Sequence, residues 1–291
     1  MFRSNDRTQT ALIKHLWERY VFGKQTVREL AKHFNKDRRT TKSLLEKYTP
    51  KQKQHHPRLV HLIVDATYFG ERKEETCWCV VVARDMYKKE DLWWSFTKTE
   101  TASVYRQMRE ELEALGYIII SVTGDGFGGI RTAFSGIYFQ MCQVHMERLV
   151  IKGTTRNPKL EAGAVLLALV RNLHDTDSNT FQRRIKQYIE KYRDFLNEKT
   201  FNPITGEQYW THKELRGSVF SLVRLQKYLF TYEHNRKIPK TTNSLEGHFR
   251  HINEVIAIHC GLAREQKEKV LHTILLAGTV APGEEILKKI L

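Results

Sequence analysis

The pattern of apolar and polar residues divides this chain into stretches of different predicted structure. Up to residue 50, apolar residues recur at helical spacing, whereas residues 59–146 contain short apolar runs typical of strands. Residues 147–240 return to helical spacing and contain no strand pattern of comparable quality. Two further helices are expected over Thr242–Ile258 and Ala263–Ala277. The order predicts a mixed α/β core interrupted by a helical region.

The first stretch has the pattern of a helix-turn-helix domain. Residues 8–22 predict one helix, and two shorter helices follow over Val27–Phe34 and Arg38–Tyr48. Thr26 and Glu29 have the spacing of a capping box at the start of the first short helix. Small and basic residues open the second, as in a recognition helix that enters the major groove. The alternative is a small helical bundle with ordinary exposed basic residues. The residues expected to contact DNA here are Arg28, Arg38, Arg39, Thr40 and Lys42.

The predicted core spans residues 59–146 and follows a basic, proline-containing linker over residues 51–58. Its pattern predicts three strands, a helix, a strand, a short helix and a last strand, in the order βββαβαβ. The first three strands are expected to form an antiparallel meander. The run YIIISVTGD at residues 117–125 is almost continuously apolar, which indicates a central strand buried on both faces. The predicted sheet is therefore mixed.

Excess positive charge is concentrated in residues 1–58. The 291 residues carry a net charge of +15, and residues 1–58 hold 15 Lys and Arg against 5 Asp and Glu, which is 15 − 5 = +10. Such a segment suits a polyanion such as nucleic acid, and a solvated basic surface is the alternative. No apolar run is long enough to cross a membrane, and four cysteines do not make a disulfide framework. A soluble, cytoplasmic protein without a membrane partner is expected.

Three acidic residues stand in unusual settings. Asp65 and Asp125 each follow an apolar run, and Glu246 lies near the start of an expected helix. A carboxylate at the end of a buried strand is costly unless it is solvated, paired or bound to a cation. Because Mg²⁺ prefers oxygen ligands, three such carboxylates would suit a divalent metal site. The alternative is that the two aspartates only cap strands or form turns.

Four short motifs carry a resemblance to a known family. They are VDATYF around Asp65, TGDGFGGI around Asp125, CQVH at Cys142–His145 and TTNSLEG around Glu246. Together with the strand order, they resemble the RNase H-like fold and, in detail, the mutator-like transposases of bacterial insertion sequences. The likeness runs over roughly residues 8–280. Related proteins often begin with a Cys-pair zinc ribbon that this sequence lacks, so an N-terminally shortened copy is one expectation.

The resemblance implies a division of the chain into five parts. An N-terminal helix-turn-helix domain precedes the linker, and an RNase H-like core is interrupted by an all-helical insertion. The last part of the core would be helices that carry the glutamate. The expected boundaries are residues 1–50, 51–58, 59–146, 147–240 and 241–291.

The resemblance also implies a function, that of a DDE transposase that cleaves and transfers DNA strands. Asp65, Asp125 and Glu246 would hold two Mg²⁺ ions, for which Mn²⁺ is expected to substitute. The implied partners are double-stranded DNA, as element terminal repeats and target, and a second copy of the chain in a homodimer or larger synaptic assembly. The protein would be cytoplasmic in a bacterium and associated with the nucleoid when bound to DNA.

Other residues are expected near this site. Asn243 and Arg250 share one helical face with Glu246, where they would orient the carboxylate or contact phosphate; helix capping is the alternative role of Asn243. Cys142 and His145 would contact phosphate or orient the ligands, and a buried cysteine beside a hydrogen-bonded histidine is the alternative. A zinc site that adds Cys77 and Cys79 to them is a further alternative.

The sequence also suggests a use for aromatic residues. Trp78, Trp93 and Trp94 are expected in the core, whereas Trp210 is expected in a polar loop, NPITGEQYWTHKE, where it would face DNA. Two rival functions remain for the whole chain. One is an inactive or domesticated DNA-binding regulator, and the other is a metal-dependent nuclease of the same fold that does not join strands.

Overall fold

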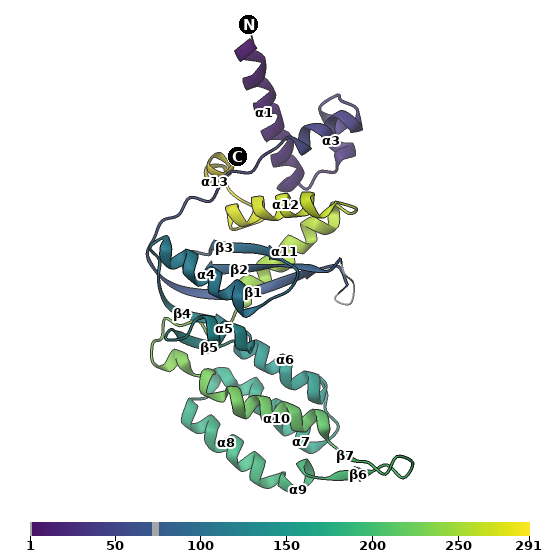
Figure 1. Ribbon diagram of the computed structural model, residues 1–291, viewed down its shortest axis with the longest axis vertical. Helices are drawn as coiled ribbons and strands as arrows, with labels where there is room; N and C mark the ends of the chain where they lie inside the picture. The colour runs from purple at the N-terminus through teal and green to yellow at the C-terminus, as the bar shows by residue number, and fades with distance from the viewer. Residues whose placement is uncertain (1, 72–75) are drawn as a thin grey trace. The chain divides into compact units, whose positions relative to one another are not determined.

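The computed structural model describes residues 2–71 and 76–291 (Figure 1). Its centre is a five-stranded sheet with the strand order β3-β2-β1-β4-β5. β4 is parallel to β1 and β5, and β3 is antiparallel to β2. The α/β class and the mixed sheet are thereby confirmed. The strands are β1 (Leu59–Phe69), β2 (Trp78–Asp85), β3 (Glu90–Thr97), β4 (Ile118–Gly124) and β5 (Tyr138–Met141).

Apolar runs explain why these segments form a central sheet. Every residue of β2 is buried, and β4 is buried over most of its length, as expected for strands covered on both faces. Three helices accompany these strands along the chain: α4 (Ala102–Ala114) lies between β3 and β4, α5 (Gly128–Ala133) lies between β4 and β5, and α6 (Gln143–Thr154) follows β5. α4 starts at an N-cap threonine, Thr101, and is followed by Gly116 with φ +90°.

Contacts divide the chain into two compact units that do not follow its linear order. Unit 1 contains residues 1–57, 66–100 and 244–291, and unit 2 contains residues 58–65 and 101–243. The division falls inside β1 and inside the first turn of α11 (Asn243–Ile258). The predicted domain boundaries, which follow the chain, stay a prediction.

Unit 1 brings the N-terminal helices together with helices from the end of the chain. The indole of Trp17 is fully buried, stacks on Tyr48 at 4.7 Å and donates a hydrogen bond of 3.1 Å to the hydroxyl of Thr273. The capping box of Thr26 and Glu29 is confirmed. The helices are α1 (Phe2–Val21), α2 (Val27–His33), α3 (Arg38–Glu46), α11, α12 (Arg264–Ala277) and α13 (Glu284–Ile290). α13 was not expected, so α12 is not the last helix.

Unit 2 contains most of the predicted helical region, which is not all-helical. A short antiparallel hairpin, β6 (Lys199–Phe201) and β7 (Gln208–Trp210), interrupts it. The side chain of Asn202 accepts the backbone N–H of Ile204, and Gly206 has φ +70°, so local turn chemistry closes the hairpin. The helices around it are α7 (Glu161–Arg171), α8 (Ser178–Lys191), α9 (Arg193–Leu196) and α10 (Lys213–Leu225).

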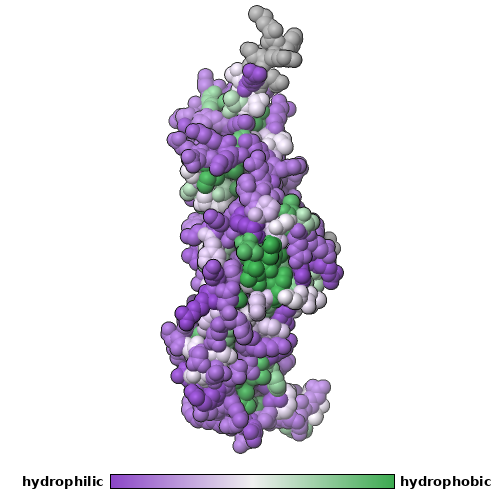
Figure 2. Space-filling model, turned by 90° about the vertical axis from the view of Figure 1, so that its left-hand side faces the viewer, coloured by the Kyte–Doolittle hydropathy of each residue, from purple (hydrophilic) through white to green (hydrophobic). Residues whose placement is uncertain are grey.

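The surface is mostly hydrophilic on the face drawn in Figure 2, and its largest hydrophobic patch lies near mid-height. Exposed apolar side chains of unit 2 include Leu59, Ile118 and Tyr138, which lie at the N-terminal ends of β1, β4 and β5. Among the described helices, none combines the length and the apolar character that a membrane crossing requires.

Candidate functional site

Two of the three predicted acids lie at the same level of two neighbouring strands. In the parallel pair of β1 and β4, Ile63 is opposite Thr123. Asp65 lies two residues after Ile63 and Asp125 two residues after Thr123, so the same register continues to the two aspartates. Both side chains are half-buried. Asp125 directly follows β4, which ends at Gly124, whereas β1 continues to Phe69, so the expectation that Asp65 marks the end of its strand is wrong.

A third residue, Cys142, follows β5 at the same level. The backbone N–H of Cys142 donates to the carbonyl of Gly124 at 2.8 Å, so Cys142 follows β5 at the level where Asp125 follows β4. The order in which the chain adds strands to the sheet reverses at β1, because β2 and β3 lie on one side of β1 and β4 and β5 lie on its other side. Crevices at the carboxyl ends of strands beside such a reversal are where open α/β sheets bind ligands.

Gly124 allows β1 and β4 to approach closely just before the aspartates. A Cβ atom at this position would lie 2.9 Å from Cδ1 of Ile130 and 3.1 Å from Cγ2 of Val64. Asp125 also accepts the backbone N–H of Phe127 at 2.9 Å, so it forms the turn into α5. Asp125 therefore forms a turn, as the alternative interpretation expects, and one of its carboxylate oxygens accepts the hydrogen bond of this turn.

Cys142 and His145 lie on the first turn of α6, with Cys142 at the N-cap. Thr242 joins them: its backbone N–H and hydroxyl lie 3.4 and 3.5 Å from Sγ of Cys142, and its hydroxyl lies 3.4 Å from Nδ1 of His145. Cys142 and Thr242 are fully buried. These contacts hold the start of α11 against the start of α6.

Opposing effects act on the thiol of Cys142. Burial raises its pKa, but the hydrogen bond and charge of His145 and the hydrogen bond from Thr242 outweigh burial, so the pKa lies below its usual value. The N-terminus of α6 acts in the same direction because its helix dipole favours a thiolate.

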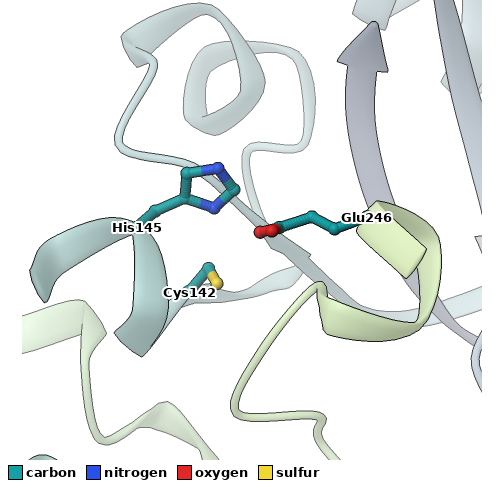
Figure 3. Close-up of side chains that lie close together, drawn as sticks. All are labelled: Cys142, His145 and Glu246. Atoms are coloured by element: carbon teal, nitrogen blue, oxygen red, sulfur yellow. The ribbon is translucent and has the colours of Figure 1, made fainter. Parts of the chain in front are cut away.

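Glu246 follows Thr242 by about one helical turn, in the first turn of α11. Glu246 belongs to unit 1, whereas Cys142 and His145 belong to unit 2. In Figure 3 the side chains of Cys142 and His145 project from the same side of the first turn of α6.

The rest of α11 follows the predicted faces. Leu245, Phe249, Ile252 and Ile256 are buried, whereas Asn243 and Arg250 are exposed. The exposed side chains therefore remain accessible for the predicted contacts with phosphate.

Sequence reasoning missed His248 on the buried face of α11. Its Nε2 lies 3.0 Å from Oδ2 of Asp91, without hydrogen-bond alignment, and Oδ1 of Asp91 accepts from Arg84 at 2.7 Å. All three side chains are buried. The available signal was the placement of His248 three residues after Leu245, on the apolar face of the helix.

The alternative zinc site with four ligands does not form. Within the described part of the chain, no group of three or more close metal-binding side chains includes Cys77 or Cys79. Both of these cysteines are buried. The expected packing role holds for Trp78 and Trp93, which are buried, whereas Trp94 is half-buried and donates to His272.

The residues predicted to contact DNA differ in their surroundings. Arg28, Arg38, Arg39 and Lys42 are exposed on α2 and α3. The hydroxyl of Thr40 donates to the N-cap residue Asp37 at 2.6 Å, so this group already has a structural partner.

Trp210 lies on β7 and not in a loop. The Arg216 guanidinium is 4.1 Å and the Lys199 ammonium 4.8 Å from its ring centre. Two cations therefore surround the half-buried indole. Its predicted contact with DNA stays a prediction.

Comparison with known proteins gives no family for this chain. No family model matches the sequence. No curated protein matches it either. The function of the protein is therefore inferred from its residues and their geometry.

Proposed function

We propose that this protein is a DNA transposase of the DDE type, built on an RNase H-like core. One observation carries the proposal: the register of the parallel strands β1 and β4 brings Asp65 to the level of Asp125, which directly follows β4. The strand order β3-β2-β1-β4-β5, with β3 antiparallel to β2 and β4 parallel to β1 and β5, is the order expected for such a core.

The residues fit the metal that this chemistry requires. Asp65, Asp125 and Glu246 offer only carboxylate oxygen, and the two aspartates lie at the same level of adjacent parallel strands, so the donor set suits Mg²⁺. When bound, a pair of such ions lowers the pKa of an attacking water or DNA 3′-hydroxyl and stabilises the leaving 3′-oxygen. No side chain is required to attack the phosphate.

Surrounding residues have roles that follow from their positions. Glu246 is held by α11, whose Leu245 and Phe249 are buried and fix its rotation. His145 is half-buried on the first turn of α6 and would contact a phosphate oxygen. Asn243 and Arg250 are exposed on α11 and would contact the DNA backbone.

The basic N-terminal helices would bind the element ends. α3 begins with Arg38 and Arg39, both exposed, and Lys42 follows one turn later. Guanidinium and ammonium groups at the start of a second short helix suit contact with phosphates and base edges in a major groove. A second copy of the chain would hold the other element end.

The test is a strand-transfer assay with the full-length protein. End-labelled duplexes that carry the sequences flanking the coding region are incubated with supercoiled target DNA and Mg²⁺ or Mn²⁺. We expect nicked and joined products from the wild type and none from Asp125→Asn. Glu265→Gln, an exposed acid on α12, is the matched control and should retain both products.

Each other outcome identifies a different function. Nicked products without joined products would indicate a metal-dependent nuclease. DNA binding without cleavage in either metal would indicate an inactive regulator. Equal activity of Asp125→Asn and the wild type would exclude Asp125 from the metal site.

A further inference from the structure

We infer that Arg131 is a positioning residue for the proposed metal ligand Asp125. The inference rests on the proposed function only in taking Asp125 as a metal ligand, and every residue that carries it belongs to unit 2. Nη1 of Arg131, on α5, donates a hydrogen bond of 2.8 Å to the carbonyl of Gly126, the residue after Asp125. Through this bond Arg131 acts on the backbone of the turn that carries Asp125.

Two hydrogen bonds hold opposite sides of one peptide group in this turn. The carbonyl of Gly126 accepts from Arg131, and the N–H of Phe127 donates to Oδ1 of Asp125 at 2.9 Å. That carbonyl and that N–H belong to the same planar peptide unit. Fixing the direction of the carbonyl therefore also fixes the direction of the N–H. Arg131 thereby orients the donor that holds the carboxylate of Asp125.

The guanidinium of Arg131 is itself held by aromatic rings. Its central carbon lies 5.3 Å from the ring centre of Tyr228 and 6.0 Å from that of Phe139. Phe139 is on β5, and Tyr228 ends the short helix η2 (Gln226–Tyr228), which follows α10. Aromatic rings attract a cation at such distances, and a planar guanidinium has few orientations to lose. The end of the helical region therefore supports the turn through Arg131.

Packing restrains the same turn from another side. A Cβ atom at Gly126 would lie 3.0 Å from Cδ1 of Leu225 and 3.4 Å from Cε of Met141, and both of these side chains are buried. This packing limits movement of Gly126, but it does not fix the rotation of the peptide group that follows. Without Arg131 that group is expected to rotate, and the carboxylate of Asp125 would lose its fixed direction.

The sign of the effect on metal affinity separates positioning from simple charge. A nearby cation repels a divalent metal ion, so loss of the Arg131 charge alone would tighten metal binding. Loss of positioning has the opposite effect, because partners that orient a metal ligand typically contribute about 10–100-fold to affinity. We expect Arg131→Gln to weaken binding of Mn²⁺ by at least about tenfold.

Binding of Mn²⁺ to the full-length protein tests the inference without an assay of activity. The electron paramagnetic resonance signal of free Mn²⁺ is recorded during titration of the wild type, Arg131→Gln and Asp125→Asn, of which the last should lose the site. Arg109→Gln is the matched control, because Nη1 of Arg109 also donates to backbone carbonyls, those of Ala133 and Ser135 at the other end of α5. This control should keep the affinity of the wild type.

Two further variants keep the test decisive if Arg131→Gln fails to fold. Arg131→Lys retains a donor but lacks the planar fork, so its affinity should lie between those of the wild type and Arg131→Gln. Tyr228→Leu changes a half-buried side chain and should also weaken binding of Mn²⁺. Because both residues act through one contact, adding Tyr228→Leu to Arg131→Gln should cause no further loss.

The outcomes separate this inference from the proposed function. Wild-type protein that binds no Mn²⁺, or binds it equally after Asp125→Asn, would overturn the proposed metal site and the inference together. Binding that requires Asp125 but is unchanged or tighter in folded Arg131→Gln would overturn the inference alone. An equal loss in Arg109→Gln would also overturn it, since general loosening of α5 would then explain the effect.

Discussion

Nε2 of His248 on α11 lies 3.0 Å from Oδ2 of Asp91 on β3, and the carboxylate of Asp91 is completely buried. Arg84 completes the network, because it donates to Oδ1 of Asp91 at 2.7 Å and to the carbonyl of Gly278 at 3.0 Å. The network thus connects the β2–β3 hairpin to α11 and to the residue that follows α12. On a helix, side chains two residues apart point to nearly opposite sides. Fixing His248 therefore also fixes the direction of Glu246.

Removal of the Asp91 charge should destabilise the protein strongly. Asp91→Asn leaves the buried guanidinium of Arg84 without its counterion, and the expected loss is about 3–5 kcal/mol in the free energy of unfolding. Glu113→Gln is the matched control, because the Arg109–Glu113 pair is partly exposed, with a distance of 2.8 Å. That change should cost about 0–1 kcal/mol. Urea denaturation followed by tryptophan fluorescence measures both, and equal effects would show that the buried network adds no stability.

Two helical glycines should respond to alanine with opposite signs. A Cβ atom at Gly153 of α6 would lie 2.1 Å from Oγ of Ser218 and 2.6 Å from the carbonyl of Glu214 on α10, so Gly153→Ala should destabilise by about 1–3 kcal/mol. Nothing lies within 4 Å of a Cβ atom at Gly217. Gly217→Ala should therefore stabilise α10 by about 0.5–1 kcal/mol. Thermal denaturation of the two variants checks the close contact of α6 and α10, which two destabilising changes would contradict.

Acid should weaken unit 1 through His259. Burial lowers the pKa of His259, which stacks on Tyr20 at 3.9 Å and donates from Nε2 to the Tyr20 carbonyl at 2.8 Å. In the unfolded chain the pKa is about 6.5. Since the unfolded state binds the proton more tightly, the stability from neutral His259 is present above that value and is lost as pH falls toward the folded pKa.

The measurement compares the wild type with His259→Gln at several pH values. The difference between their free energies of unfolding should shrink below about pH 6.5, by at most about 1.4 kcal/mol per pH unit. A constant difference from about pH 8 to 5 would show that His259 titrates alike in both states. The subtraction removes contributions from other titrating groups.

Basic residues on α3 should dominate the salt dependence of DNA binding. Arg39→Gln and Lys42→Gln each remove one exposed cation, so the double variant should reduce the slope of log affinity against log salt by about 2. Lys186→Gln, an exposed change on α8, is the control and should leave the slope unchanged. Fluorescence anisotropy with labelled duplex DNA over a range of salt concentrations measures these slopes. An unaffected double variant would place the DNA elsewhere.

Local patterns were sufficient to predict the central sheet and part of the site. Asp65 and Asp125 each follow an apolar run, and equivalent positions of adjacent parallel strands lie side by side. The continuation of β1 beyond Asp65 to Phe69 was not predicted. The capping box of Thr26 and Glu29 was also visible, because both partners lie within four residues. Each of these features is encoded by neighbouring residues.

Contacts between distant segments could not be predicted from local sequence patterns. The approach of Thr242 to Cys142 joins residues 100 positions apart, and nothing local to either residue specifies it. The β6–β7 hairpin was missed because each strand has three residues, too few for alternation of apolar and polar positions to appear. Asp91 gave no signal because its partners, Arg84 and His248, come from two other elements.

The contacts of unit 1 between distant segments affect how the chain folds during its synthesis on the ribosome. The buried indole of Trp17 finds its hydrogen-bond partner 256 residues later, at Thr273. The helices α1–α3 therefore emerge before α12 and lack the surface that covers their aromatic core until α12 has been synthesised. Residues 101–243, which make up most of unit 2, are translated in the meantime. The nascent chain must carry exposed aromatic residues during this interval, when exposed apolar surface favours aggregation and chaperone binding.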